Sequence, residues 1–563
     1  MTLSRPWRAA LATLACLASL GVFFRGQLAD GFALLIGDRH DGVIALAIME
    51  HWSNLLRGEA AAWDRTFYFH PVPATLGYND GYLAFGLLLA AFRAAGADPF
   101  LAGELANVAL RAIGFLGCHL LARRVFGLSF SWALLGAALF TLSNNLFIRA
   151  SHAQLFSVSL VPMLGVLAHG AGAALIAGRR GALLGWGAGF VLWHAMMLLT
   201  GFYMAWYAAL FGALLLPAWL LVAGAGRRGA LLRGVARGWW ALAGLGGFAA
   251  LVNLPFLRLY LPKARETGMH DYAGMVAQYT LSPLDILHVG ERNLLWGWLV
   301  RALNDAFRPG FPAWSEQMTG LPLLLVLLFA GALAWVWRGA PDDRAVLLRA
   351  IAIATVASWA LTIRLGESSP WWLVYQHVPG ARAARVVARY QIFITVPVIG
   401  LALAMLAALL ARLPPARATA LAGLAAALLL AEQVNLYAPR FLDRGLELSR
   451  LRAVPPPPAA CRAFFVTAAR TESRFGEEVA NIYNHNTEAM LIAEVLRLPT
   501  INGISTFNPP HWPGGFPPQP EYLEAVRRHA AAWDVEDGLC GLDLQRFAWD
   551  TAPLSAAAPP PPR

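Results

Sequence analysis

Long apolar stretches recur from Ala9 to Val434, and they constrain the fold of this chain more than any other feature. They are long enough to cross a bilayer as helices. A soluble domain carries about 25% charged residues, whereas this chain of 563 residues is 14% charged and 58% hydrophobic. The sequence therefore predicts an α-helical polytopic membrane protein, and it excludes secreted enzymes, cytosolic enzymes and DNA-binding factors.

The net charge of +11 informs topology and does not indicate binding to nucleic acid. Arginine clusters occupy five linkers between apolar stretches, and all five are cytoplasmic if the N-terminus is cytoplasmic. This agreement requires that stretch 82–95, which is short and contains Arg93, is interfacial or re-entrant. About 11 transmembrane helices are then expected, near 9–24, 99–121, 131–148, 155–177, 181–202, 204–224, 239–258, 321–337, 345–364, 389–411 and 416–435.

This topology places four segments outside, in the periplasm if the protein occupies a bacterial inner (cytoplasmic) membrane. They are a first loop at 25–98, a middle loop at 259–320, a short loop at 365–388 and a tail from 436 onward. We therefore divide the chain into a transmembrane domain, 1–438, and a small C-terminal periplasmic α/β domain, 439–563, with proline-rich ends.

The C-terminal segment has the composition of a soluble domain. Cys461 and Cys540 can form a disulfide if this segment faces an oxidising compartment. Its apolar pattern predicts a strand at 461–467, a helix at 488–496, a strand and turn at 498–504 and a helix at 521–533.

The densest polar cluster, Gly37 to Gly42, follows the first span and contains Asp38, His40 and Asp41. Carboxylates just outside a membrane can deprotonate an acceptor hydroxyl or hold a divalent cation. The alternative is structural, because an Asp at this place often caps a helix, and Asp41 precedes an apolar run from residue 43.

Further acidic residues follow in the same loop. Residues 43–56 predict an amphipathic helix that carries Glu50 and His51 on one turn. Asp80 follows an aromatic run at 67–71, and aromatic faces can stack on sugars. Glu50 and Asp80 are therefore supporting acidic candidates.

A second candidate site lies just before the tenth span. Arg382, Arg385 and Arg389 are spaced i, i+3, i+7, which predicts one helical stripe. Arginine on the outer side opposes the positive-inside bias, and its planar fork suits a phosphate. Snorkelling to lipid headgroups is the alternative.

Between spans three and four, His152 and Gln154 lie near the outer mouth of the helices. Like His40 of the first loop, they are possible substrate contacts. The alternative for His152 and Gln154 is that they satisfy polar groups between helices. The middle loop, which contains Trp314, Ser315 and Glu316, is a candidate lid.

Five short segments carry a resemblance to a known family. They are Gly37-Asp38-x-x-Asp41 with Glu50-His51, Trp63-Asp64 with Phe67 to Pro71 and Asn79-Asp80, Ser151-His152-x-Gln154-Leu155, Val378-Pro379-Gly380 with Arg382 and Arg385, and Met490 to Pro509. These segments and the order of spans and loops resemble the GT-C class of integral-membrane glycosyltransferases of bacteria. The resemblance implies a sugar transferred from a polyprenyl-phosphate carrier to a glycan, lipid or protein acceptor, with an early-loop Asp, here Asp38 or Asp41, as general base.

The leading hypothesis is inverting glycosyl transfer at the membrane surface, with no certain cofactor and with a divalent metal ion left open. One rival is a transporter or flippase of lipid-linked sugars, which predicts ionisable residues along a path across the bilayer. The other rival is a non-catalytic membrane scaffold of the same architecture. The sequence leaves open the sugar, the acceptor and the choice between Asp38 and Asp41.

Overall fold

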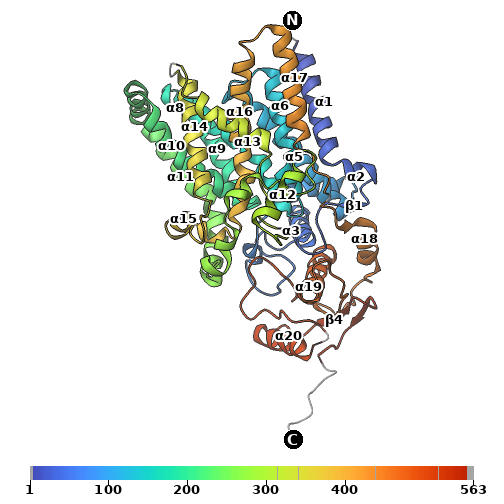
Figure 1. The fold of residues 1–563 in the computed structure, drawn as a ribbon. Helices are drawn as coiled ribbons and strands as arrows, with labels where there is room; N and C mark the ends of the chain where they lie inside the picture. The colour runs from blue at the N-terminus through green and yellow to red at the C-terminus, as the bar shows by residue number, and fades with distance from the viewer. Residues whose placement is uncertain (1–3, 313–314, 340–341, 438, 518, 555–563) are drawn as a thin grey trace.

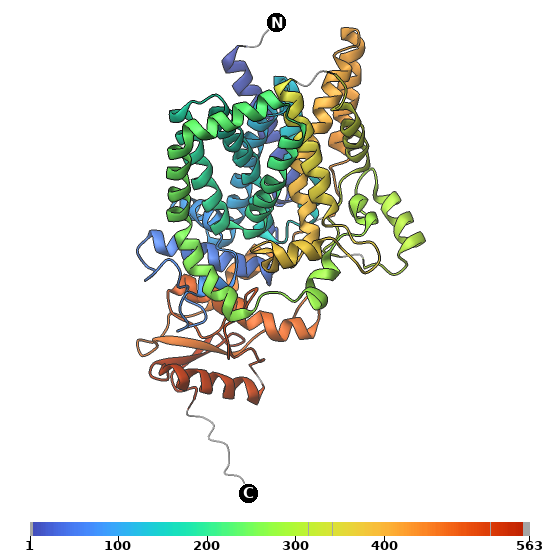
Figure 2. The same cartoon turned by 90° about the vertical axis from the view of Figure 1, so that its left-hand side faces the viewer.

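A computed structural model describes residues 4–312, 315–339, 342–437, 439–517 and 519–554. Upright helices form one part of the molecule, and the C-terminal segment lies at their lower end (Figures 1 and 2). The long helices of the upright part are α1 (Arg5–Phe23), α5 (Pro99–Arg124), α6 (Phe130–Thr141) with α7 (Asn144–Ile148), η2 (Ala153–Leu160) with α8 (Val161–Ile176), α9 (Arg180–Thr200), α10 (Phe202–Val222), α11 (Ala225–Thr267) and η7 (Val387–Arg389) with α16 (Tyr390–Leu410).

These long helices give eight candidate membrane spans among the described residues. Three further expected spans coincide with α13 (Leu323–Trp335), α14 (Asp343–Ala360) and α17 (Pro415–Ala431), so every expected span falls on a helix. These three helices are shorter or more charged, and the total of 11 stays a prediction. Stretch 82–95 forms α4 (Leu83–Ala94), whose 12 residues span about 18 Å. A bilayer core is about 30 Å thick, so α4 is too short to cross it alone.

Local sequence signals explain where these helices begin. At the start of α5, the Asp98 carboxylate accepts hydrogen bonds from the backbone N–H groups of Phe100 and Leu101, both at 3.1 Å. Pro99 occupies the first helical position, where its missing N–H has no helical partner to lose. Helix α16 is mostly apolar and is buried at every residue from Tyr390 to Met405, so it forms a central element of the bundle.

Helix α3 (Asp41–Leu56) confirms the helix expected in the first loop, but its polar face is not exposed as that of an amphipathic surface helix would be. Every residue from Val43 to Asn54 is buried. The covering elements include α4 and, from the C-terminal segment, α19 (Glu477–Leu496), whose Glu494 accepts a hydrogen bond from Asn54 at 2.8 Å. The polar face of this helix is thus an internal contact surface.

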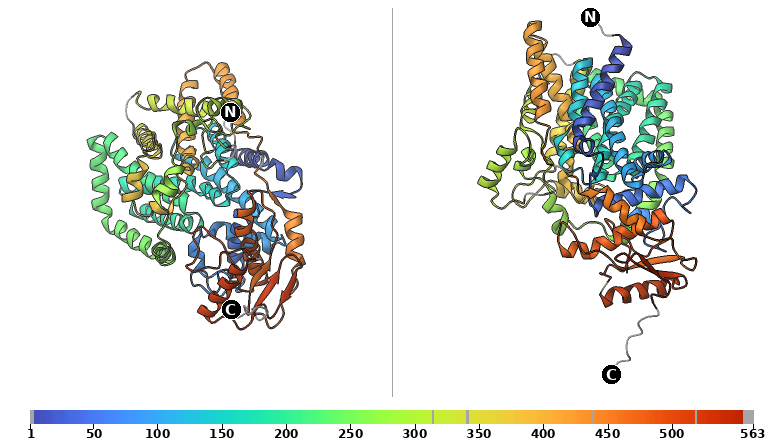
Figure 3. Two further views of the ribbon diagram at one scale, coloured as in Figure 1. Left: turned by 60° about the horizontal axis from the view of Figure 1, so that its bottom comes forward. Right: turned by 90° about the vertical axis from the view of Figure 1, so that its right-hand side faces the viewer.

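The first loop and the C-terminal segment lie next to each other (Figure 3), and backbone hydrogen bonds also connect them. Strands β1 (Leu34–Leu35) and β2 (Leu442–Asp443) pair in antiparallel register. The remaining short elements of the loops are α2 (Arg25–Ala29), η1 (Thr75–Tyr78), η3 (Tyr272–Val276), η4 (Ala277–Tyr279), η5 (Pro283–Leu287), α12 (Gly297–Phe307), α15 (Trp371–His377), η6 (Ala381–Ala383) and α18 (Arg444–Ala453).

The C-terminal segment folds as a three-stranded sheet with helices. Strand β4 (Leu539–Asp543) is central, parallel to β3 (Ala463–Ala468) and antiparallel to β5 (Ala548–Asp550). Helix α19 begins at residue 477, earlier than expected, while α20 (Pro520–Trp533) falls where a helix was expected. The strand expected at 498–504 is reduced to one bridge between Phe464 and Thr500. A disulfide joins Cys461 to Cys540.

Candidate functional site

Asp41, the first residue of α3, is partly exposed, and 45% of its side-chain surface is accessible. The turn that presents it depends on Gly37, whose φ of 100° favours glycine and whose added Cβ would lie 3.3 Å from the Gly42 Cα. The carboxylate Oδ2 lies 3.1 Å from Nδ1 of His152.

His152 connects Asp41 to a second carboxylate, that of Glu316 in the middle loop. The Nε2 atom of His152 lies 3.0 Å from Oε1 of Glu316. Arg149, the residue after α7, approaches the same oxygen at 2.5 Å. Arg389, which immediately precedes α16, approaches it at 3.3 Å. Four segments distant in sequence therefore meet in one charged cluster, defined here as Asp41, Arg149, His152, Glu316 and Arg389.

Charge within this cluster keeps its carboxylates ionised. Burial would raise the pKa of Asp41, but the close contact with His152 and the charge of Arg389 outweigh burial and lower it. Burial likewise opposes ionisation of Glu316, yet Arg149 and Arg389 hold its pKa well below the usual range. Asp41 is therefore an ionised, accessible carboxylate at neutral pH.

Asp38 lies close by in sequence but has a different environment. Only 5% of the residue is exposed. Its Oδ1 accepts hydrogen bonds from the backbone N–H of His40 at 3.0 Å and of Gly42 at 3.5 Å. Its Oδ2 is paired with Arg474 of the C-terminal segment, with Nη2 at 2.6 Å. Both carboxylate oxygens of Asp38 thus have partners that hold the loop in place.

The His40 ring of the same loop contacts the C-terminal segment. It packs edge-on against Tyr483 of α19, with ring centroids 5.3 Å apart. Burial lowers the pKa of His40, although Asp38 and Asp41 oppose this shift.

The two supporting acids lie outside the charged cluster. Glu50 is 1% exposed, and its Oε1 lies 3.2 Å from Nε of Arg93. Asp80 accepts a hydrogen bond from the backbone N–H of Phe202 at 2.7 Å, at the start of α10. Burial raises the pKa of Asp80 to about 6. Gln154 accepts a hydrogen bond from the Tyr82 hydroxyl at 3.1 Å.

The expected helical stripe of arginines is wrong. Ala384 and Val386 have ψ values of 92° and 87°, so the chain turns in η6, extends and turns again in η7 before α16 begins. The arginines consequently point to different surroundings. Arg382 lies over the Tyr375 ring at 5.2 Å, Arg385 lies over the Tyr279 ring at 5.6 Å, and Arg389 is buried in the charged cluster.

Sequence reasoning did not select Arg149, Arg474 or Tyr483 and treated Glu316 only as part of a candidate lid. Arg149 carried a usable signal, because it ends an apolar stretch on the same side as the candidate acids. The other three carried no local signal, since their roles arise from contacts with residues that are distant in sequence.

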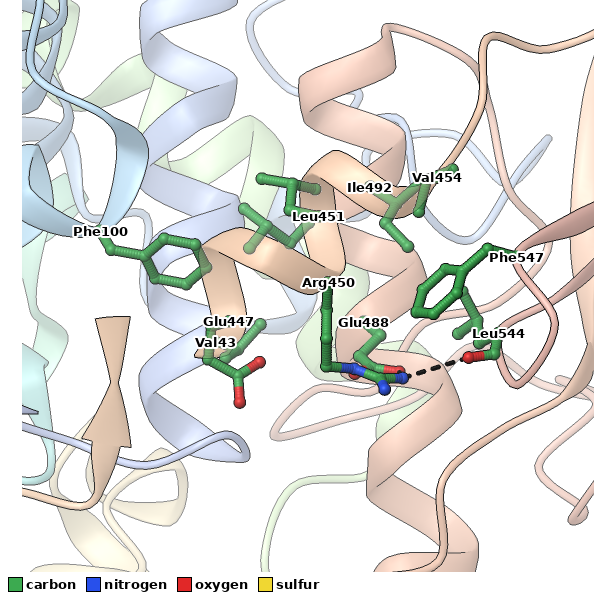
Figure 4. A pocket seen from close by; sticks show the side chains of 11 residues that line it. Val43, Phe100, Glu447, Arg450, Leu451, Val454, Glu488, Ile492, Leu544 and Phe547 are labelled. Carbon is green, nitrogen blue, oxygen red and sulfur yellow. Dashed lines mark hydrogen bonds and ion pairs between the residues drawn. The ribbon is translucent and has the colours of Figure 1, made fainter. Parts of the chain in front are cut away.

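Two cavities described in the structure lie away from this cluster. One, of about 20 Å³, lies between α18 and α19 beside the ion pair of Arg450 and Glu488 (Figure 4). That volume holds about one water molecule. The other, of about 540 Å³, is lined by Arg527, Arg528 and Leu554 at the surface of the C-terminal segment. The candidate site is therefore defined by its charged groups.

The charged cluster is not arranged to hold a metal ion. Within the part of the chain that the structure describes, no three or more His, Cys, Asp or Glu side chains converge on a common point suited to a metal. The two ring nitrogens of His152 address two different carboxylates, and Oε1 of Glu316 already faces two guanidinium groups. These donors do not fit a divalent cation.

The fold is similar to solved structures of membrane glycosyltransferases. The oligosaccharyltransferase of Archaeoglobus fulgidus in the apo form has a TM-score of 0.50 at 13% identity, over 89% of this chain and 65% of that chain. The same enzyme in complex with Zn and sulfate has a TM-score of 0.50 at 13% identity, over 94% of this chain and 67% of that chain.

The arabinofuranosyltransferase AftD from Mycobacteria has a TM-score of 0.51 at 17% identity, over 90% of this chain and 32% of that chain. This chain thus spans about two thirds of the oligosaccharyltransferase and one third of AftD. No family model and no curated protein matches its sequence. The chain is a membrane protein with the fold of the GT-C class of glycosyltransferases.

Proposed function

We propose that this chain transfers a sugar from a polyprenyl-phosphate carrier to an acceptor hydroxyl, with Asp41 as the general base. The observation that carries the proposal is the accessible, ionised carboxylate of Asp41 within a cluster built from four loop segments. The similar solved structures include an oligosaccharyltransferase and an arabinofuranosyltransferase, which supports glycosyl transfer as the reaction class.

The reaction is a single displacement. Asp41 takes the proton of the acceptor hydroxyl as its oxygen forms a bond to the anomeric carbon. The bond from that carbon to the phosphate oxygen breaks, and the polyprenyl phosphate leaves with the electron pair. His152 holds the Asp41 carboxylate in place through the 3.1 Å contact.

Arg385 is our candidate for holding the donor phosphate near this base. Arg385 lies four residues before Arg389 of the charged cluster, and its side chain is partly exposed. Arg382 lies three residues earlier on an exposed turn and is accessible to a lipid-linked donor. A guanidinium fork is suited to the oxygens of a phosphate.

Asp38 acts in this proposal as a positioning residue. Its oxygens are occupied by Arg474 and two backbone N–H groups, so it is not free to accept a proton from an acceptor. It instead fixes the turn from which Asp41 projects.

The orientation proposed is a cytoplasmic N-terminus with the charged cluster and the C-terminal segment in the periplasm. Contacts link the four segments assigned to the outer side: Asp38 pairs with Arg474, the His270 ring lies against the Phe507 ring, and the His270 backbone N–H donates to the Arg382 carbonyl at 3.2 Å. A transporter or flippase remains the alternative, and buried Arg111 within α5 is the observation in its favour.

The test is a donor panel in proteoliposomes that contain the purified protein. Radiolabelled polyprenyl-phosphate sugars are supplied with a membrane extract as the source of acceptor. Transfer from one donor, with a raised KM for that donor in Arg385→Gln, supports the proposal. Arg301→Gln is the control, because Arg301 is an exposed arginine of α12. Flux of lipid-linked sugar across the bilayer without transfer would support the transporter.

A further inference from the structure

Glu316 is surrounded by positive charge to an unusual degree. Arg149 and Arg389 both approach its carboxylate, and His152 lies at 3.0 Å. The Arg149 side chain is fully buried and that of Arg389 is 5% exposed. Buried guanidinium groups are costly to desolvate, and they persist where they have partners with good geometry.

This arrangement disagrees with a metal-dependent site. A divalent cation at Glu316 would lie beside two guanidinium groups of the same sign, and their repulsion would oppose its binding. The oligosaccharyltransferase with a similar fold was solved with Zn. The cluster in this chain, by contrast, contains two carboxylates and two arginines, so its negative charge is already balanced without an added cation.

We infer that the guanidinium groups of Arg149 and Arg389, which both contact Glu316, supply within the charged cluster the positive charge that a divalent metal would otherwise provide, so that this chain transfers its sugar without a metal ion. The inference rests on the proposed function. The charge of Arg389 acts on Asp41 itself and also on Asp80. Fixed positive charge of this kind favours a reaction in which a phosphate departs with an electron pair.

The atoms balance without a further reactant. The acceptor proton passes to Asp41, the new glycosidic bond forms, and the phosphate leaves with its negative charge. Arg149 and Arg389 remain protonated throughout and gain or lose no atom.

Two measurements on the full-length protein in detergent test the inference. The first is the number of Mn²⁺ ions bound per chain after chelator treatment and dialysis, followed by titration with Mn²⁺ alone and detection by electron paramagnetic resonance. We expect no stoichiometric site. One ion per chain that is lost in Glu316→Gln or Asp41→Asn would overturn the inference.

The second measurement is transfer with and without chelator, for the wild type and charge variants. We expect the same rate in both conditions. Arg149→Gln with Arg389→Gln should lose transfer by about 100-fold or more, whereas the two Lys replacements should retain more of it, because they keep the charge. Arg308→Gln, which removes an arginine 2.5 Å from buried Asp285, controls for the loss of an ion pair elsewhere.

The two proposals fail in different ways. Transfer that stops with chelator and returns with Mn²⁺ overturns the inference and supports glycosyl transfer. Absence of transfer from every donor overturns the proposed function, and the Mn²⁺ titration still decides whether the cluster binds a metal. Transfer at the wild-type rate in the Gln variants would also overturn the role of the two arginines.

Discussion

The ion pair between Asp38 and Arg474 fastens the first loop to the C-terminal segment, and Arg474→Gln should loosen that attachment. Arg474 Nη2 lies 2.6 Å from Oδ2 of Asp38, whose side chain is 7% exposed. In the variant, the Asp38 carboxylate would lose its guanidinium partner and keep the hydrogen bonds from the backbone N–H groups of His40 and Gly42. A buried charge without a counter-charge destabilises the state that buries it.

The cost follows from the burial of the pair. Removal of one partner costs about 3–5 kcal/mol for a fully buried pair, and an exposed pair contributes about 0–1 kcal/mol. Because 28% of the Arg474 side chain is exposed and the backbone donors remain, we expect about 2 kcal/mol, between these limits. Since about 1.4 kcal/mol changes an equilibrium constant tenfold, the open form of the loop should be populated about 30 times more than in the wild type.

Hydrogen exchange at the amides of His40 and Gly42 measures this opening directly, because both amides donate to Asp38. Arg462→Gln is the control, since its pair with Asp537 is exposed on both sides, at 78% and 88%. In the Asp38→Asn background, Arg474→Gln should add little. Unchanged exchange at both amides in Arg474→Gln would refute this reasoning.

Two further predictions concern the charged cluster and the disulfide. Because the pKa of Asp41 is lowered, the base stays ionised as pH falls, and transfer should decline only below the ordinary titration range of Asp. The variant His152→Ala should move this decline to higher pH, because it removes a group that lowers the pKa of Asp41 and leaves the effect of burial, which raises it. A pH–rate profile of both proteins checks the shift, and an unchanged acid limb contradicts it. Cys461→Ser with Cys540→Ser should destabilise the C-terminal segment by about 2–4 kcal/mol, because the bond joins residues 79 apart. Limited proteolysis measures that loss, and equal cleavage rates would contradict it.

The sequence predicted the fold well where apolar length alone decides the outcome. Every expected span coincides with a helix, and the short stretch 82–95 forms α4, because burial of apolar surface and internal hydrogen bonding both favour helices there. The prediction failed where tertiary contacts override local pattern. The spacing of Arg382 and Arg385 suggested one helix, but extended residues at Ala384 and Val386 divide the segment.

The candidate site was predicted in part. The resemblance and the polar pattern selected Asp41 and His152, which the structure brings together, but could not separate Asp41 from Asp38. That separation needs Arg474, which is more than 400 residues away in sequence. Glu316 and Arg149 contact each other only because loops from different spans converge, and no local spacing encodes that contact.

The comparison of Asp41→Asn with Asp38→Asn tests the central claim most directly. Both proteins are reconstituted at equal amounts of folded chain, and transfer from the preferred polyprenyl-phosphate sugar is measured. We predict that Asp41→Asn loses about 10²–10⁴-fold in rate, as expected when a general base is removed, while Asp38→Asn retains most of its transfer per folded molecule. Wild-type transfer in Asp41→Asn, or an equal loss in Asp38→Asn with its loop still protected from exchange, would contradict the assignment of Asp41 as the base.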